Sequence, residues 1–287
     1  MAGGTVPREP TAYRLAYDGR GYHGFQRQSD VPTVEGALFD ALRSLEVLPE
    51  DATAPPDYAA AGRTDAGVSA VAQTVAFEAP RWLTPVVLSH ALPPDVAAWA
   101  RARVPTSFHA THDAVGRHYR YHLPAAGLDE ARLRFACDAL SGAHDVRNLA
   151  AVDGAEPRRT RIAVRRAGDW FELDFRGRGF ARQQVRRTVG AVRAVAAGEA
   201  PRARLGRLLE ATAIPGHLAP AVAPAEPLVL VDVRYHGLDF DVDAEATTHA
   251  REAMAMAREA ALTRARVLDD LGAGVGAGRS RNRGPDS

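Results

Sequence analysis

The feature that most constrains the fold of this chain is the order of its strand-like and helix-like segments, which runs through a similar series twice. Before Pro105, alternating apolar residues predict strands at 12–18, 71–77 and 96–104. Helices are expected after Thr33, reaching about Leu45, and after Thr84, where the next residue is a proline suited to a first helical turn. This series suggests the β-α-β-β-α-β order of a split βαβ unit, in which one of the four strands gives no separate signal.

The second half, from 106 to 240, repeats that order. Strands are predicted at 116–123, 160–166, 170–176 and 228–235, with a hairpin turn at 168–169. Helices are predicted from Asp129 to near 142 and over 180–197. The pattern indicates an α+β protein in which two split-βαβ, ferredoxin-like halves form a mixed, mainly antiparallel sheet with helices on one side.

Two further segments follow these halves. Residues 241–271 form a separate unit, most of which is predicted to be an amphipathic helix that begins near 243. Residues 272–287 are rich in Gly, Ser, Arg and Asn, so a disordered tail is expected there.

Composition excludes several classes of protein. The 287 residues contain one cysteine, Cys137, which rules out a disulfide framework and a thiolate zinc site. No segment has the length and apolarity of a membrane span or a signal peptide, so a cytoplasmic protein without membrane contact is expected.

Charge is segregated along the chain. The net charge is only +1, yet residues 158–187 hold ten arginines and three acidic residues. Such a block is typical either of a solvated face or of a surface that binds nucleic acid.

The most informative stretch is Gly-Arg-Thr-Asp-Ala-Gly-Val-Ser-Ala at 62–70, in a loop between predicted strands. An aspartate between glycines can simply shape a turn. However, this stretch resembles the GRTDAGVxA signature of the TruA family of tRNA pseudouridine synthases, and other segments resemble family motifs in the same order. These are 17–19 with 24–28, then 107–110, 117–121, 180–190 and 224–228. The sequence departs from the family pattern at a few positions, which are Phe25, Ser69, Pro227 and 182–184.

The resemblance implies the pseudouridine synthase fold, with a catalytic cleft between the halves. It also implies isomerisation of uridine at positions 38, 39 and 40 of the tRNA anticodon stem-loop, by a homodimer and without a cofactor or a metal. Asp65 matches the catalytic carboxylate, which attacks C1′ or C6 or stabilises a glycal-forming step. Arg186 matches its arginine partner, and Tyr119 matches an aromatic residue that stacks on the flipped base and helps to remove the C5 proton.

Other positions are candidates for substrate binding. Arg63 matches an arginine that fills the space left by the flipped base, although a phosphate contact is an equal alternative. Leu228 matches an apolar residue on the base, or is an ordinary core leucine. Phe25 and Gln26 belong to the Gly-rich loop that matches the family, and Arg178 and Arg182 belong to the basic block.

The sequence disfavours three alternative interpretations. Four histidines, at 109, 112, 118 and 122, do not have the spacing of a zinc site and are expected at the surface or against RNA. A non-catalytic RNA-binding protein has no use for an acid such as Asp65 on a phosphate-binding surface. A phosphatase with an aspartate nucleophile needs a further set of residues to hold magnesium, which is not found near Asp65.

Overall fold

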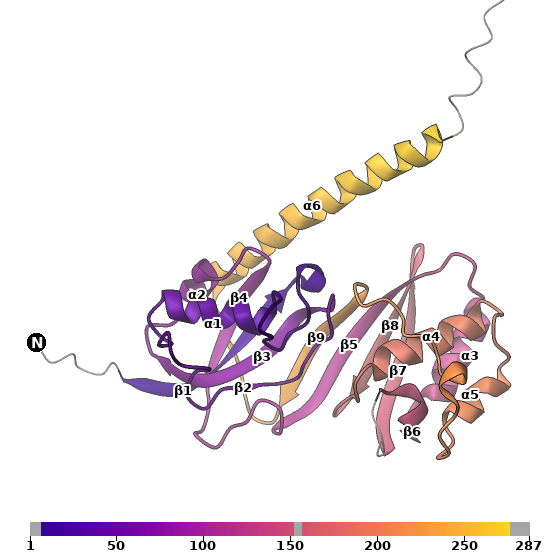
Figure 1. The fold of residues 1–287 in the computed structure, drawn as a ribbon, viewed down its shortest axis with the longest axis horizontal. Helices are drawn as coiled ribbons and strands as arrows, with labels where there is room; N and C mark the ends of the chain where they lie inside the picture. The colour runs from indigo at the N-terminus through magenta and orange to yellow at the C-terminus, as the bar shows by residue number, and fades with distance from the viewer. Residues whose placement is uncertain (1–6, 152–156, 276–287) are drawn as a thin grey trace, which may run out of the picture.

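One ten-stranded sheet runs through the whole molecule and carries helices on one face (Figure 1). This computed structural model describes residues 7–151 and 157–275. The strands lie in the order β10-β4-β1-β3-β9-β5-β8-β7-β6, and β2 pairs with β3 beside this path. Their bounds are β1 Arg8–Tyr17, β2 Ala59–Ala60, β3 Ser69–Pro80, β4 Val96–Arg103, β5 Ala114–Pro124, β6 Gly142–Asp145, β7 Pro157–Ala167, β8 Trp170–Gly177, β9 Leu228–Tyr235 and β10 Asp241–Val242.

The two halves share one topology. In the first half the strands lie in the order β4-β1-β3-β2, and in the second half β9-β5-β8-β7 repeats that order. In both halves, therefore, the fourth strand lies beside the first and the third lies between the first and the second. This is the split βαβ arrangement, and it confirms the predicted fold class.

The halves join where β3 meets β9. Ser69 pairs with Val229 and Ala70 with Leu230, and this is the one parallel pairing among the strands of residues 7–151 and 157–275. The register holds the start of β3 beside the start of β9. Loops that precede these two strands, one from each half, are thereby brought together.

The helices begin where side-chain caps were predicted. Thr33, Thr84 and Asp129 each accept a hydrogen bond from a backbone N–H of the first helical turn. The helices are α1 Val34–Ser44, α2 Pro85–Ala91, α3 Glu130–Leu140, α4 Gln184–Ala196, α5 Ala203–Leu208 and α6 Ala244–Gly274, with short 3-10 turns η1 Gly19–Gly21, η2 Arg147–Leu149 and η3 Gly216–Leu218.

The predicted start of the helix at 180 is wrong. Gln183 has a φ of 61°, in the left-handed region, so the chain turns there and α4 begins only at Gln184. The predicted buried stripe of α4 is confirmed, because Val185, Val189 and Val192 are all buried.

Each half has its own hydrophobic core between the sheet and its helices. In the first half, Tyr13, Leu15 and Tyr17 of β1 pack with Leu38 and Leu42 of α1. In the second half, alternate residues of β8, which are Phe171, Leu173 and Phe175, pack in one cluster with residues of α3 and α4. The residues between them face away from the helices.

The chain returns to the first half at its end. β10 pairs with β4, and α6 begins with Asp243 as its N-cap. Only Ala246 and Ala250 of α6 are buried, and the rest of the helix extends away from the body (Figure 1). The helix reaches Gly274, three residues beyond the predicted end, and the remaining predicted tail, 276–287, lies outside the described residues. Within the described ranges, no helix combines the length and the hydropathy needed to cross a membrane.

Candidate active site

Asp65 lies in a tight turn just before β3. The backbone N–H of Val68 donates to the Asp65 carbonyl over 3.1 Å, which closes a four-residue turn. Gly67, the third residue of this turn, has a φ of 82°, a conformation that a type II turn requires and that glycine adopts without strain. The turn leaves the Asp65 side chain 29% exposed at the junction of the halves.

The Gly-rich loop between β1 and α1 supports this turn. The N–H of Phe25 donates to the Thr64 carbonyl (3.1 Å), and the N–H of Gly67 donates to the Tyr22 carbonyl (3.2 Å). The turn is also anchored to the core, where the hydroxyl groups of Tyr17 and Thr64 lie 2.8 Å apart. Asp65 is thus held on both sides by backbone bonds and anchored through its buried neighbour.

Arg186 of α4 reaches Asp65 from the other half. Its Nη1 lies 2.9 Å from Asp65 Oδ2, and its Nε donates over 2.8 Å to the Ala223 carbonyl, which fixes the direction of the guanidinium. Asp65 and Arg186 are 121 positions apart in sequence. The guanidinium therefore lies directly against the Asp65 carboxylate, in a charge-assisted hydrogen bond that joins the two halves.

Tyr119 lies on the central strand β5, on the helix-bearing side of the sheet. Its ring contacts Phe180 edge to face, with the ring centroids 5.4 Å apart. Burial raises the pKa of Tyr119 to about 12; the charge of Arg117 opposes this rise and that of Asp65 adds to it. The Tyr119 phenol is therefore neutral at physiological pH, and the charge of Asp65 contributes to its raised pKa.

The other predicted substrate-binding residues occupy different environments. Arg63 and Gln26 are exposed in the two loops that meet at Asp65. Leu228 is buried at the start of β9. Phe25 is fully buried and packs near Tyr17, so its side chain supports the loop from inside rather than presenting a surface.

The basic block of 158–187 divides between two faces of the sheet. Arg178 and Arg182 are exposed in the segment between β8 and α4, which leads to Arg186. Arg161 of β7 pairs in register with Arg176 of β8, and both are exposed on the face that the helices do not cover. Strand alternation has therefore separated arginines that the sequence places together.

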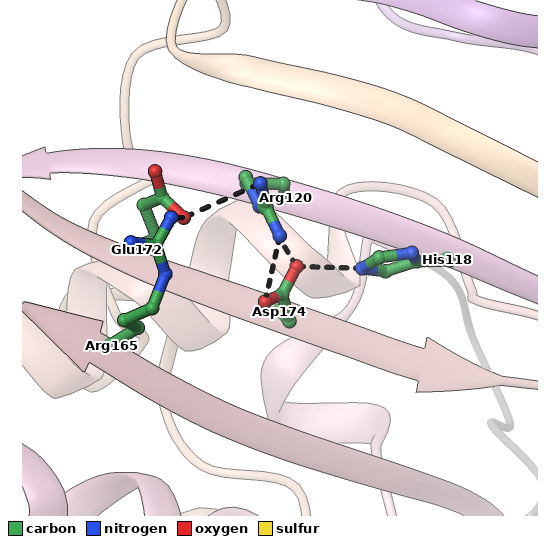
Figure 2. Close-up of polar contacts among 5 residues, drawn as sticks. All are labelled: His118, Arg120, Arg165, Glu172 and Asp174. Atoms are coloured by element: carbon green, nitrogen blue, oxygen red, sulfur yellow. Dashed lines mark hydrogen bonds and ion pairs between the residues drawn. The ribbon is translucent and has the colours of Figure 1, made fainter. Parts of the chain in front are cut away.

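That open face carries a network of ion pairs, drawn in Figure 2. Asp174 of β8 lies 2.6 Å from the ring nitrogen Nε2 of His118 and 2.9 Å from Nε of Arg120. Glu172 lies between Arg120 and Arg165, at 3.3 and 2.5 Å. Arg165 is thus engaged in a structural network on the face opposite Tyr119.

The histidines singled out in the sequence do not gather in one place. His109 and His112 lie side by side with ring centroids 4.2 Å apart, whereas His118 belongs to the network around Asp174. Over residues 7–151 and 157–275, no cluster of three or more His, Cys, Asp or Glu side chains is arranged to hold a metal ion.

Three contributors to the site were missed at the level of sequence. Thr64 anchors the turn, the Ala223 carbonyl orients Arg186, and Arg117 bonds to backbone carbonyls of both halves. Arg117 and Thr64 lie within the motifs that resemble the family, so a signal for them existed. Ala223 contributes through its backbone, which no residue pattern reveals.

Comparison with known proteins identifies the family. A family model described as tRNA pseudouridine synthase matches residues 136–236. The protein named tRNA pseudouridine synthase A of Natronomonas pharaonis is 53% identical over 262 residues, covering 91% of this chain and 98% of the relative. This chain belongs to the TruA family of tRNA pseudouridine synthases.

Two more relatives of that name extend the comparison. The protein of Haloarcula marismortui is 46% identical over 273 residues, covering 92% of this chain and 99% of the relative. That of Methanosarcina mazei is 38% identical over 229 residues, covering 78% and 84%. As a TruA-family member, the chain matches its relatives across both halves, which includes the turn that holds Asp65.

Proposed function

We propose that the protein converts uridine to pseudouridine in tRNA, at positions 38, 39 and 40 of the anticodon stem-loop. The observation that carries this proposal is the ion pair between Asp65 and Arg186, 2.9 Å long, at the junction of the two halves. A binding protein gains nothing from a carboxylate on a surface that must attract phosphates, whereas an enzyme accepts that cost to obtain a reactive group.

The residues present suit the chemistry. The N1–C1′ bond breaks, the base turns and it rejoins through C5, so no electrons and no external group are required. Asp65 acts as the anion at the sugar or at C6, and the hydrogen bond from Arg186 holds its carboxylate in one direction. The target base must leave the helical stack to reach Asp65, and the half-buried ring of Tyr119 offers a surface on which it stacks.

The exposed residues around the Asp65–Arg186 pair suit contacts with the tRNA. Arg63 lies two positions before Asp65 and is exposed, which suits a contact with the space left by the flipped base or with a phosphate. Arg178 and Arg182 are exposed in the segment that leads to α4, which suits a basic surface beside the site. The protein acts in the cytoplasm as a homodimer, with one tRNA contacting both subunits, as the family resemblance implies.

Incubation of the purified protein with unmodified tRNA, followed by mapping of pseudouridine at single-nucleotide resolution, tests the proposal. Modification is expected at positions 38, 39 and 40 without added cofactor. The matched control is Asp65→Asn, which keeps the shape of the side chain and removes its charge. This variant is expected to bind tRNA and to form no pseudouridine. Modification by Asp65→Asn at the wild-type rate would refute the assignment, and binding of tRNA without any modification by the wild type would favour a non-catalytic RNA-binding protein.

A further inference from the structure

Arg117 connects three loops around the candidate active site. It belongs to β5, two residues before Tyr119, and is partly buried. Its Nη1 donates to the Arg178 carbonyl over 2.5 Å, and its Nη2 donates to the carbonyls of Ala61, at 2.5 Å, and Thr111, at 3.2 Å. One guanidinium therefore bonds to backbone from both halves of the molecule.

Two of these loops carry the reacting groups. Ala61 lies four residues before Asp65, in the segment that ends in the catalytic turn. Arg178 lies between β8 and α4, in the segment that leads to Phe180, against which Tyr119 packs, and then to Arg186. Joining the two segments fixes the distance across which Arg186 must reach Asp65.

The third loop strengthens the connection. Thr111 receives a hydrogen bond from Arg117 at its carbonyl and donates from its hydroxyl to the Ala60 carbonyl over 2.5 Å. The segment at 60–61 is thus held by two bonds that lead back to the same guanidinium. This chain of bonds lies on the helix-bearing side of the sheet, near the Tyr119 ring.

Arginine suits this position better than lysine. A guanidinium has five N–H donors in a planar fork, so it can bond to carbonyls in different directions at once. A lysine ammonium keeps the charge but is a compact group at the end of a flexible stem. Replacing Arg117 with lysine therefore retains the charge and loses the geometry of the connection.

We propose that Arg117 is a positioning residue, which sets the alignment of Asp65 with Arg186 and Tyr119 by fastening the 60–62 segment to the 178–179 segment. This inference rests on the proposed function, because the alignment matters only if Asp65 reacts. Arg117 does not touch the reacting atoms in this role. It acts through the two loops that it joins.

The test compares Arg117→Lys and Arg117→Gln with a matched control on the same strand. Arg120→Lys removes an arginine fork from β5 on the opposite face, where it bonds to Asp174. Single-turnover pseudouridine formation, tRNA affinity and amide hydrogen exchange are measured for each variant and for the wild type. Exchange is followed in peptides that cover 60–67 and 176–183.

Both Arg117 variants are expected to lower the single-turnover rate at least tenfold and to change tRNA affinity by less than threefold. They are also expected to speed exchange in both peptides, whereas Arg120→Lys changes neither the rate nor the exchange of these peptides. Unchanged exchange would overturn the connection between the loops. Faster exchange with an unchanged rate would overturn its role in alignment.

The two proposals fail in distinguishable ways. If the wild type forms no pseudouridine, the proposed function fails, and hydrogen exchange without tRNA still decides whether Arg117 joins the loops. If the wild type is active and Arg117→Lys loses tRNA affinity in proportion to its rate, Arg117 serves binding and the positioning role is wrong. Should Arg117→Gln unfold, the lysine variant decides the question alone.

Discussion

At the scale of single residues, Tyr119 has two proposed roles: its ring stacks on the flipped base, and its hydroxyl group takes a proton. Tyr119→Phe keeps the ring that we propose to stack on the flipped base and removes the hydroxyl group that we propose to take the C5 proton. If that transfer is part of the reaction, the single-turnover rate is expected to fall by about 10²- to 10⁴-fold, the usual contribution of acid–base catalysis. Quench-flow measurement with saturating enzyme checks this, and tRNA affinity serves as the control. A near wild-type rate would restrict Tyr119 to stacking.

The pKa of about 12 adds a pH dependence to this prediction. Only the phenolate accepts a proton, and its fraction grows about tenfold per pH unit below pH 12. If proton removal limits the rate, the wild-type single-turnover rate therefore rises between pH 7 and 9, and the rate of the phenylalanine variant does not. Equal slopes for the two proteins would contradict the assignment.

The sequence predicts only those residues of the candidate site that act through their side chains. Asp65, Arg186 and Tyr119 were identified from motifs that resemble a family, and the structure brings Asp65 and Arg186 into contact. The Ala223 carbonyl was not predictable, because every residue carries such a group and only the fold decides which one faces Arg186. Arg117 stood in a recognised motif, but its three partners are also backbone carbonyls.

At the scale of elements, α4 depends on a close approach to the segment that follows α5. A Cβ on Gly190 would lie 2.0 Å from the Ala221 carbonyl oxygen, so Gly190→Ala must push this segment away. We expect a loss of roughly 1–3 kcal/mol in the free energy of unfolding, the usual cost of overpacking. The single-turnover rate should fall as well, because Ala223, two residues on, orients Arg186.

Gly206→Ala is the matched control for this change. It lies inside helix α5, and an added Cβ meets nothing within 4 Å. Alanine favours a helix interior over glycine, by up to about 1 kcal/mol, so this variant should be as stable as the wild type or more stable. Chemical denaturation measures both variants. Equal stability of the two would show that the segment at 221 moves at no cost.

The ion-pair network of β5, β7 and β8 gives a prediction for stability and pH. Burial raises the pKa of Asp174, but hydrogen bonds from Arg120 and His118 outweigh this effect and the net shift is downward. A lowered pKa stabilises the folded state above the unfolded pKa of roughly 3.9, and the contribution is lost as pH falls through the folded value. Asp174→Asn is expected to lower the free energy of unfolding by about 2 kcal/mol at pH 7.

Urea denaturation at several pH values checks this prediction. The difference between wild type and Asp174→Asn should shrink below about pH 4, where the unfolded chain begins to protonate the carboxylate. Asp40→Asn is the control, since the Asp40 side chain is 78% exposed where it pairs with Arg43 on α1, and ion pairs of such exposed carboxylates contribute at most about 1 kcal/mol. A difference that stays constant down to pH 3 would exclude the carboxylate charge as its source.

Most elements were predictable because their signals are local. Thr33, Thr84 and Asp129 cap helices through their own side chains, and β9 spans the predicted residues, Leu228–Tyr235. The start of α4 was not predictable, because glutamine rarely adopts the left-handed conformation found at Gln183. Helix α5 has only six residues, too few to show a periodic pattern.

At the scale of the whole molecule, the division of the arginines between two faces yields a test of the RNA path. Arg178→Ala and Arg182→Ala are each expected to weaken tRNA binding and to reduce the slope of log affinity against log salt by about one. Arg161→Ala, on the open face of β7, is the control and should change neither. Binding titrations at several salt concentrations measure both quantities. An equal effect of Arg161→Ala would place the tRNA on the other face or on both.

The joining of the halves is the part of the fold that sequence could not reveal. The repeated order of elements predicted two similar units, and the shared strand order of the two halves confirms them. That β9 pairs with β3 depends on only two residue pairs between strands far apart in sequence. No local pattern specifies such a register, yet it decides where Asp65 meets Arg186.

The pairing of β3 with β9 also determines when, during synthesis of the chain, the candidate site can form. When Asp65 leaves the ribosome, neither Arg186 nor β9 exists, and at 5–20 residues per second the stretch up to Tyr235 takes about 10–30 s more. During that interval the first half already has the sequence for its own β4-β1-β3-β2 sheet, and its carboxylate has no partner. If Asp65 and Arg186 react as proposed, the nascent chain cannot modify uridine until the second half is made and its last strand, β9, pairs with β3.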